Sequence, residues 1–578
     1  MKNKQQSIKP SKIQWMMLSV LALVVYTYWS LTLNDIPTGP LPYQNDPEID
    51  WNILPKNAYL NSSLIVETQV RGHVYLSKPK APLLIIMHGN HPTCENSFEI
   101  DWERCTTQNP EIQSDLGYTY LANHFVKKGY AVLAPSFNKN LNPNLNIKNR
   151  YDINARANLV LKTIVAFQNK SLKIPGINVL DYIDFDNIAI IGHSRGGEAC
   201  RALEELLAKV KPSIKVYGLF EFAPTDYGLN NTVSFHNPGK SQYLSILGTC
   251  EGDVMNFSGS TVFERAQEVP SIYRRSSIAV VGANHNFFNT NWSPSDTLFY
   301  CPNALFPSNA TESVKQQEIG LLFLTGFIDA VFNDLDFDPL TIEPPKDIRI
   351  LIETVPPNKT LLFDNSDSLI LNNSQVEDIT PYVSRQYYQH SDYYKMQLMD
   401  AGKKRNMSFN EINFSPAIDQ NVTIIHFGAN STVTIPLRST ECDYIDIQIG
   451  SRMYCGSKDC EITPTVLNFK LLQIIGDVNN LESIDQLEID DDYVNHMPFN
   501  PSPPSSKTNE TNGFFKTASN SSIDLTLSPT KILLNTKRIY LNMYTGKFKG
   551  IVLESSTPTT VVLGHIFGGF IQKIKPFP

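Results

Sequence analysis

A short turn of small residues at 192–196 constrains the fold of this chain most, because it joins two segments of opposite type. The apolar run at 187–191 is typical of a buried strand, and the segment 198–207 is typical of a helix. The turn between them consists of Gly192, His193, Ser194, Arg195 and Gly196. A serine at so sharp a turn has a strained backbone and needs small neighbours, which the two glycines provide. The pattern therefore predicts that the Ser194 hydroxyl lies at a helix N-terminus, which stabilises developing negative charge.

A serine nucleophile needs a base, and the base needs an acid that orients it. The strand predicted at 242–247 leads into a loop that carries Glu251 and Asp253. The strand predicted at 277–281 leads into a loop that carries His285. Open α/β sheets place their reactive groups just beyond the carboxyl ends of strands, so we expect these side chains to meet the serine. We predict His285 as the base and Asp253 as the acid, with Glu251 as the alternative acid.

A third strand is predicted at 82–87, and it ends in a His-Gly turn. The backbone N–H of Asn90, just after this turn, and that of Arg195, just after the serine, are the expected oxyanion-hole donors. His88 and His91 lie in the same turn, but they have no nearby carboxylate partner in the sequence. We therefore expect no metal site here.

These segments resemble the α/β-hydrolase superfamily, in particular its secreted bacterial members. The resemblance covers roughly residues 60–335 and is carried by Gly-His-Ser-Arg-Gly-Gly-Glu at 192–198 and Gly-Ala-Asn-His-Asn-Phe-Phe-Asn at 282–289. It implies a mostly parallel sheet with flanking helices and a serine hydrolase triad of Ser194, Asp253 and His285. The implied reaction is hydrolysis of a small or polymeric carboxylic ester through an acyl-enzyme, with no cofactor. The resemblance implies neither the acyl group nor the alcohol of that ester.

The N-terminus resembles a targeting element, because lysines precede a long uncharged stretch at 13–34. About 20 apolar residues span a bilayer, and no small-x-small cleavage pattern follows this stretch. We predict an uncleaved membrane anchor at 1–34, an irregular stem at 35–60 and an extracytoplasmic catalytic domain. A cleaved signal peptide and a secreted protein are the alternative.

Net charge limits the class of partner, and cysteine usage fits this location. A net charge of −8 over 578 residues argues against nucleic acid as a partner. Eight cysteines suit an oxidising compartment. The expected pairs are Cys94–Cys105, Cys250–Cys301 and Cys455–Cys460. Cys200, on the helix after Ser194, is expected to be a buried free thiol, and Cys442 is left unassigned.

The chain divides into two folded parts at a proline-containing linker predicted for 336–350. The α/β catalytic domain is predicted at 61–335, with helices at 151–168 and 316–332. In the first of these helices, polar residues including Arg156 are expected to cap and to form salt bridges rather than to contact substrate.

After the linker, short alternating runs separated by turns predict an all-β sandwich of the jelly-roll type at 351–578. Two of these runs are at 422–427 and 431–437. A segment near 498–522 is rich in Pro, Ser, Thr and Asn and is expected to be a flexible insertion.

A second function from another class is a surface adhesion or carbohydrate-binding protein that acts through the β-rich domain. Its tyrosines are candidates for glycan contact, although aromatic clusters in β-domains more often pack in the core or at the rim. These residues are Tyr387, Tyr388, Tyr393 and Tyr394. A passive platform would not need Ser, Asp and His in catalytic order, and this favours the hydrolase.

Overall fold

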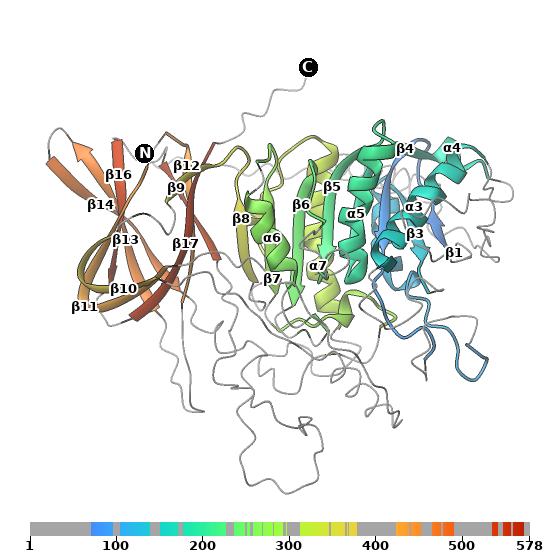
Figure 1. Cartoon of the computed structure of the whole chain (residues 1–578), viewed down its shortest axis with the longest axis horizontal. Coiled ribbons are helices and arrows are strands. Elements are labelled where there is room, and N and C mark those ends of the chain that lie inside the picture. The colour runs from blue at the N-terminus through green and yellow to red at the C-terminus, as the bar shows by residue number, and fades with distance from the viewer. Residues whose placement is uncertain are drawn as a thin grey trace, which may run out of the picture.

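A computed structural model of the chain contains two β-sheets, one with helices on its faces and one without (Figure 1). The described residues are 71–95, 105–138, 151–170, 177–226, 236–248, 251, 253–254, 258–268, 270–280, 282–292, 296, 313–345, 348, 350–363, 367, 369–378, 423–438, 441–451, 465–475, 478–489, 535–541, 547–555 and 559–570.

The first sheet has eight strands in the order β1-β3-β2-β4-β5-β6-β7-β8. The six strands from β3 to β7 are parallel, and the edge strands β1 and β8 run antiparallel to their neighbours. The strand bounds are β1 Arg71–Tyr75, β2 Ala81–Met87, β3 Ala131–Ser136, β4 Ile183–His193, β5 Lys215–Phe222, β6 Gln242–Gly248, β7 Arg275–Val280 and β8 Ile350–Val355. This order, with the serine turn directly after β4, is the α/β-hydrolase arrangement that the sequence predicts.

Helices cover both faces of this sheet, because its parallel strands are apolar on both sides. In β2, Leu83 and Ile85 pack with α3, α5 and α6, whereas Leu84 and Ile86 pack on the other face with α2 and α7. The helix bounds are α2 Thr119–Lys127, α3 Tyr151–Gln168, α4 Val179–Tyr182, α5 Arg195–Val210, α6 Ser258–Glu268 and α7 Ser313–Phe332. The two cores fix the strands between them, and so fix the loops at their carboxyl ends.

The second sheet is antiparallel throughout its described strands and includes β9 to β17. The strand bounds are β9 Thr360–Phe363, β10 Ile370–Asp378, β11 Thr423–Pro436, β12 Tyr444–Ser451, β13 Thr465–Ile475, β14 Val478–Ile489, β15 Asn535–Tyr540, β16 Lys547–Ser555 and β17 Thr559–Gly569. The sequence predicted this all-β character.

The long strand β11 joins the two halves of the second sheet. Its first half, at 423–427, pairs with β17, and its second half, at 431–436, pairs with β16. Ile425 and Val433, one from each half, lie in the same hydrophobic core. The hydrogen bonds therefore run through one continuous sheet that turns around a single core. The two runs predicted at 422–427 and 431–437 form this one strand.

The border between the two parts lies later than the sequence suggests. Strand β8, at 350–355, pairs with β7 and belongs to the first sheet, although we expected the β-rich domain to begin at 351. The expected linker also contains Phe337, which packs on Phe327 of α7 with ring centroids 5.8 Å apart. An alternating apolar strand fits the edge of either sheet, so its pattern does not reveal its partner. The border falls at 356–359, between β8 and β9.

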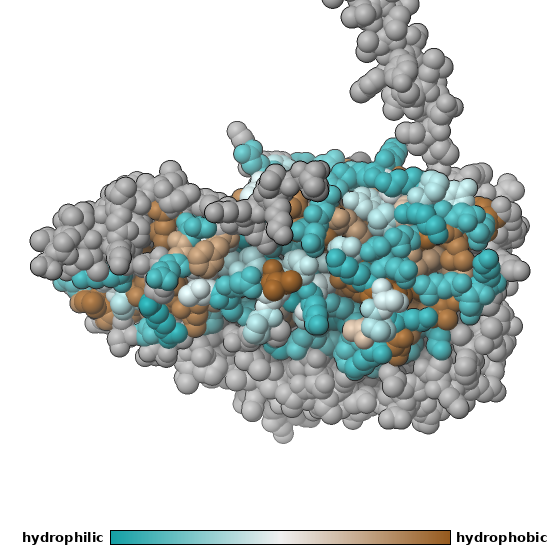
Figure 2. Space-filling model, turned by 90° about the horizontal axis from the view of Figure 1, so that it is seen from above, coloured by the Kyte–Doolittle hydropathy of each residue, from teal (hydrophilic) through white to brown (hydrophobic). Residues whose placement is uncertain are grey.

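Several predictions fall outside the described residues: the anchor at 1–34, the stem at 35–60, the insertion at 498–522, the candidate glycan-contact tyrosines, and the pairs Cys250–Cys301 and Cys455–Cys460. Across the ranges that the structure describes, none of the helices combines the length and apolar character needed to cross a bilayer. On the face shown in Figure 2, hydrophobic residues are interspersed with hydrophilic ones.

Candidate active site

Ser194 forms the whole connection between β4, which ends at His193, and α5, which begins at Arg195. Its backbone has φ +58° and ψ −126°, a conformation that residues other than glycine rarely adopt. Hydrogen bonds hold this conformation. The Ser194 N–H donates to the carbonyl of Phe222 at 2.9 Å, and its carbonyl accepts from the N–H of Thr225 at 3.1 Å. The predicted serine turn is therefore present, and the positive end of the α5 dipole lies at Ser194.

Close packing explains why glycines flank this serine. A Cβ on Gly196 would lie 2.0 Å from the Met87 carbonyl oxygen, and one on Gly192 would lie 2.4 Å from the Gly196 carbonyl oxygen. A Cβ on Gly89 would lie 2.3 Å from the Cβ of Ser194 and 2.9 Å from its Oγ. The backbone of the turn after β2 therefore runs directly against the Ser194 side chain. Asn90, the predicted oxyanion donor, is the next residue of that turn.

His285 lies in the loop after β7 and is fully buried, with a carboxylate on each side of its ring. Its Nδ1 is 3.6 Å from Glu251 Oε2, and its Nε2 is 3.6 Å from Asp253 Oδ2. In a serine triad the acid faces Nδ1, and Nε2 faces the nucleophile. The structure thus brings all three predicted residues of the acid and base loops together. It places the alternative acid, Glu251, at Nδ1, and the predicted acid, Asp253, at Nε2.

These carboxylates decide the charge of His285. Burial alone disfavours the imidazolium, but Glu251, Asp253 and the nearby Asp296 outweigh it and raise the pKa of His285 to about 9. Burial also raises the pKa of Glu251. Glu251 is itself held in place, since its Oε1 accepts a hydrogen bond from the Gly248 N–H at 2.8 Å.

Two side chains that the sequence analysis did not select position the loop of His285. Asp296 accepts from the N–H of Asn286 at 2.9 Å and from the N–H of Asp253 at 3.2 Å, so it joins the acid loop to the histidine loop. Gln316 of α7 donates to the Asn284 carbonyl at 2.7 Å and accepts from the Asn284 N–H at 3.1 Å. No local motif marks these contacts, because they join segments far apart in the chain.

A group of rings packs around His285. The ring centroid of His193 lies 4.8 Å from that of His285, and Trp292 stacks on His285 at 6.3 Å with an interplanar angle of 14°. His91 also stacks on Trp292, with their ring centroids 5.0 Å apart. Burial lowers the pKa of His91 to about 4. Because His193 directly precedes Ser194, its ring contact with His285 connects the serine turn to the loop of His285.

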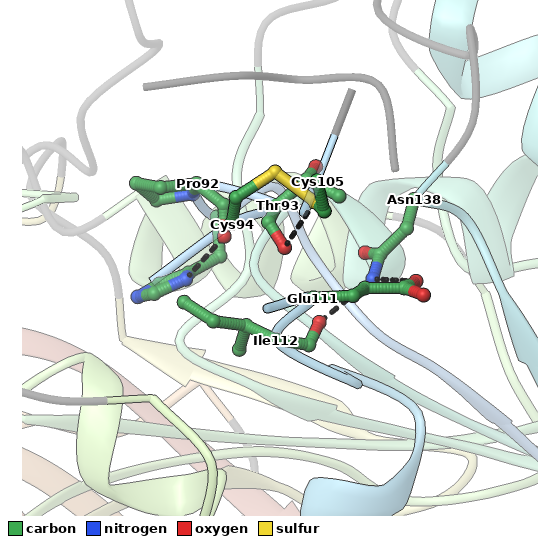
Figure 3. Close-up of a disulfide and its surroundings, with 8 residues drawn as sticks. Pro92, Thr93, Cys94, Cys105, Glu111, Ile112 and Asn138 are labelled. Carbon is green, nitrogen blue, oxygen red and sulfur yellow. Dashed lines mark hydrogen bonds between the residues drawn. A yellow bond between two sulfur atoms is a disulfide. The ribbon is translucent and has the colours of Figure 1, made fainter. Parts of the chain in front are cut away.

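A disulfide anchors the turn after β2, as predicted. Cys94 and Cys105 are bonded (Figure 3), and beside them the Ile112 N–H donates to the Thr93 carbonyl at 2.7 Å. Asn138, which follows β3, donates to the Ile112 carbonyl at 2.7 Å (Figure 3). The predicted free thiol is also observed, since Cys200 is buried and is not in a disulfide.

His88 has a structural role in the same turn. The Phe137 N–H donates to its Nε2 at 2.7 Å, so Nε2 carries no proton and Nδ1 donates to the Gly89 carbonyl at 2.7 Å. Burial and the neighbouring Arg156 lower the pKa of His88 to about 3, which keeps it neutral. Among the described residues, no three His, Cys, Asp or Glu side chains are arranged to hold a metal ion.

Comparisons with known proteins give little beyond this geometry. No protein-family model matches the chain, and no curated protein does. A solved dienelactone hydrolase from Anabaena variabilis is 14% identical and covers 42% of this chain and 88% of its own, with a TM-score of 0.26. A ferulic acid esterase from Streptomyces cinnamoneus is 13% identical and covers 47% of this chain and 74% of its own, with a TM-score of 0.32. Likeness at this level does not indicate what this chain acts on.

Proposed function

We propose that this protein is a serine hydrolase that cleaves carboxylic esters, with Ser194 as its nucleophile. The observation that carries the proposal is the strained turn of Ser194, which lies beside a histidine enclosed by carboxylates. Strained non-glycine backbone of this kind costs about 1–3 kcal/mol and persists where function uses it.

In the proposed reaction, His285 Nε2 takes the proton of the Ser194 hydroxyl as Oγ bonds to the ester carbonyl carbon. The carbonyl π electrons move to the oxygen, which the N–H groups of Asn90 and Arg195 stabilise. When the tetrahedral adduct collapses, the carbon–oxygen bond to the alcohol breaks, and His285 returns the proton to the leaving alkoxide. Water then repeats the two steps on the acyl-enzyme and releases the acid and free Ser194.

We assign the orienting role to Glu251 rather than to Asp253. The support is the side of the ring that each carboxylate faces, Nδ1 for Glu251 and Nε2 for Asp253. Glu251 is fully buried and hydrogen-bonded to the backbone, as an orienting acid needs to be, whereas the Asp253 side chain is 19% exposed. Asp253 then lies at the Nε2 edge of His285, where its negative charge favours the protonated ring.

The same proposal includes a location outside the cytoplasm, with the N-terminal segment as an anchor or a cleaved signal. The Cys94–Cys105 disulfide supports it, since structural disulfides are rare in reducing compartments. The substrate would then be an ester encountered outside the cytoplasm, either small or polymeric.

The test is labelling of the full-length protein with an alkyl fluorophosphonate, followed by peptide mass measurement. We expect one adduct, on the peptide that contains Ser194, because only an activated serine displaces the fluoride. Ser194→Ala should remove the adduct. Ser245→Ala is the matched control, because Ser245 is a buried serine of β6 that bonds Ser277 and not the site. A folded wild-type protein that takes up no label and hydrolyses no ester would contradict the proposal.

A further inference from the structure

We infer that Arg156 is a positioning residue that sets the orientation of the oxyanion hole, an inference that rests on the proposed ester hydrolysis. Arg156 lies on α3 and is 1% exposed. Its Nη1 donates to the His88 carbonyl at 2.8 Å and to the Gly89 carbonyl at 3.3 Å. Its guanidinium carbon also lies 4.8 Å from the ring centroid of Phe137. The guanidinium is thus enclosed on one side by a ring and directed at the turn after β2.

Two donors converge on one carbonyl oxygen. The Gly89 oxygen accepts from Arg156 Nη1 and also from His88 Nδ1 at 2.7 Å. The His88 tautomer is itself fixed by the Phe137 N–H at its Nε2. The direction of the Gly89 carbonyl is therefore set from two sides by side chains that are themselves buried.

The direction of this carbonyl determines that of the next N–H. In a trans peptide the C=O of one residue and the N–H of the next point in opposite directions in the same plane. When Arg156 and His88 hold the Gly89 carbonyl, they also turn the Asn90 N–H to the opposite side. Gly89 lies directly against the Ser194 side chain, so this peptide adjoins the space where the oxyanion forms.

In this turn the Asn90 N–H would bind the oxyanion, and Arg156 would keep that N–H in the right direction. Without the guanidinium, the 89–90 peptide is free to rotate, and the Asn90 N–H no longer points at the oxyanion. The side chain removed is not itself a substrate contact in this proposal. Arg156 should then affect the chemical step far more than substrate binding. A misplaced donor costs up to about 100-fold in rate.

Steady-state kinetics of Arg156→Met and Arg156→Lys in the full-length protein test this inference. We expect Arg156→Met to lower kcat roughly 10- to 100-fold while KM changes less than about twofold, and Arg156→Lys to recover part of kcat. The matched control is Arg275→Met. Arg275 is also a buried arginine that donates to backbone carbonyls, those of Ser241 and Gly239, at the other end of its strand from His285. The Arg275→Met variant should be less stable than the wild type and should have an unchanged kcat.

A thionoester measurement separates positioning from stability. Sulfur accepts hydrogen bonds poorly, so the ratio of ester to thionoester turnover reports the hydrogen bonds to the oxyanion. We expect this ratio to fall in Arg156→Lys, and in Arg156→Met if that variant folds. An unchanged ratio, or a kcat loss matched by Arg275→Met, would overturn the role of Arg156. Absence of fluorophosphonate labelling in the wild type would instead overturn the hydrolase proposal.

Discussion

At the scale of single residues, the two carboxylates beside His285 differ in the nitrogen that they face. Glu251 is at Nδ1 and Asp253 at Nε2, each at 3.6 Å. The sequence could not decide between them, because they lie two residues apart in one loop and both fit the order of serine, acid and histidine. By contrast, the strand, turn and helix around Ser194 are local, so this residue could be predicted from its neighbours alone.

We predict that Glu251→Gln and Asp253→Asn have unequal effects on kcat. Glu251→Gln should lower kcat about 10⁴-fold, the scale for loss of a triad acid, because the amide no longer stabilises the correct tautomer and the imidazolium. Asp253→Asn should lower kcat far less. Ester kinetics at the optimum pH of each variant distinguish the two. The reverse order would return the orienting role to Asp253.

The raised pKa of His285 predicts an alkaline pH profile. Its pKa of about 9 means that the ring is protonated at neutral pH and cannot accept the Ser194 proton. Because the deprotonated form is the active one, kcat/KM should rise with pH and level off above about pH 9. Asp253→Asn removes a negative charge that favours the protonated ring, so the rise should move to lower pH.

This profile is measured with a neutral ester over roughly pH 6 to pH 10. Asp367→Asn is the control, because Asp367 pairs with Arg438 in the β-rich domain. It should leave the profile unchanged. A rise near the ordinary histidine pKa of about 6.5 in the wild type would show that the carboxylates do not hold the proton.

At the scale of elements, the strands and helices of the first sheet follow their apolar patterns closely. Helix α3 spans 151–168 as predicted, and β6 and β2 begin within one residue of their predicted starts. These patterns could not show the hydrogen bonds by which one element positions a loop next to another. Arg156 of α3 donates to the turn after β2, and Gln316 of α7 donates to the loop of His285. Such contacts arise only when segments far apart in the chain pack together.

Helix α7 gives a prediction at this scale. Gln316→Leu keeps the approximate volume but leaves the N–H and C=O of Asn284 buried without their partner, at about 1–3 kcal/mol for each group. The loop of His285 should loosen, so both the free energy of unfolding and kcat should fall. Glu318→Ala, at an exposed position of the same helix, is the control and should change stability by about 0.5 kcal/mol or less. An unchanged kcat in Gln316→Leu would show that the loop keeps its place without α7.

At the scale of the whole molecule, buried charges join the two sheets. Arg538 of β15 forms a two-point contact with Asp446 of β12, at 2.6 and 2.7 Å, and also bonds Asp338 from the first part of the chain. Arg274, just before β7, donates to the Tyr444 hydroxyl across the same boundary at 3.0 Å. These arginines and aspartates lie apart in the sequence and look like ordinary surface charges there, so the interface could not be predicted.

This interface predicts that the two parts unfold together. In Arg538→Met the buried carboxylate of Asp446 and the half-buried one of Asp338 lose Arg538 and keep only their longer contacts to Arg274, at 3.9 and 3.4 Å. Breaking a buried pair costs about 3–5 kcal/mol. Calorimetry should show one transition for the wild type and two for Arg538→Met, with the β-rich domain melting first. Arg438→Met is the matched control, because Arg438 is 40% exposed and pairs with Asp367 within the β-rich domain, where such pairs contribute about 0–1 kcal/mol. If both variants keep a single transition at similar temperature, the domains are coupled by their apolar contacts, such as that of Phe567 with the first core, rather than by these charges.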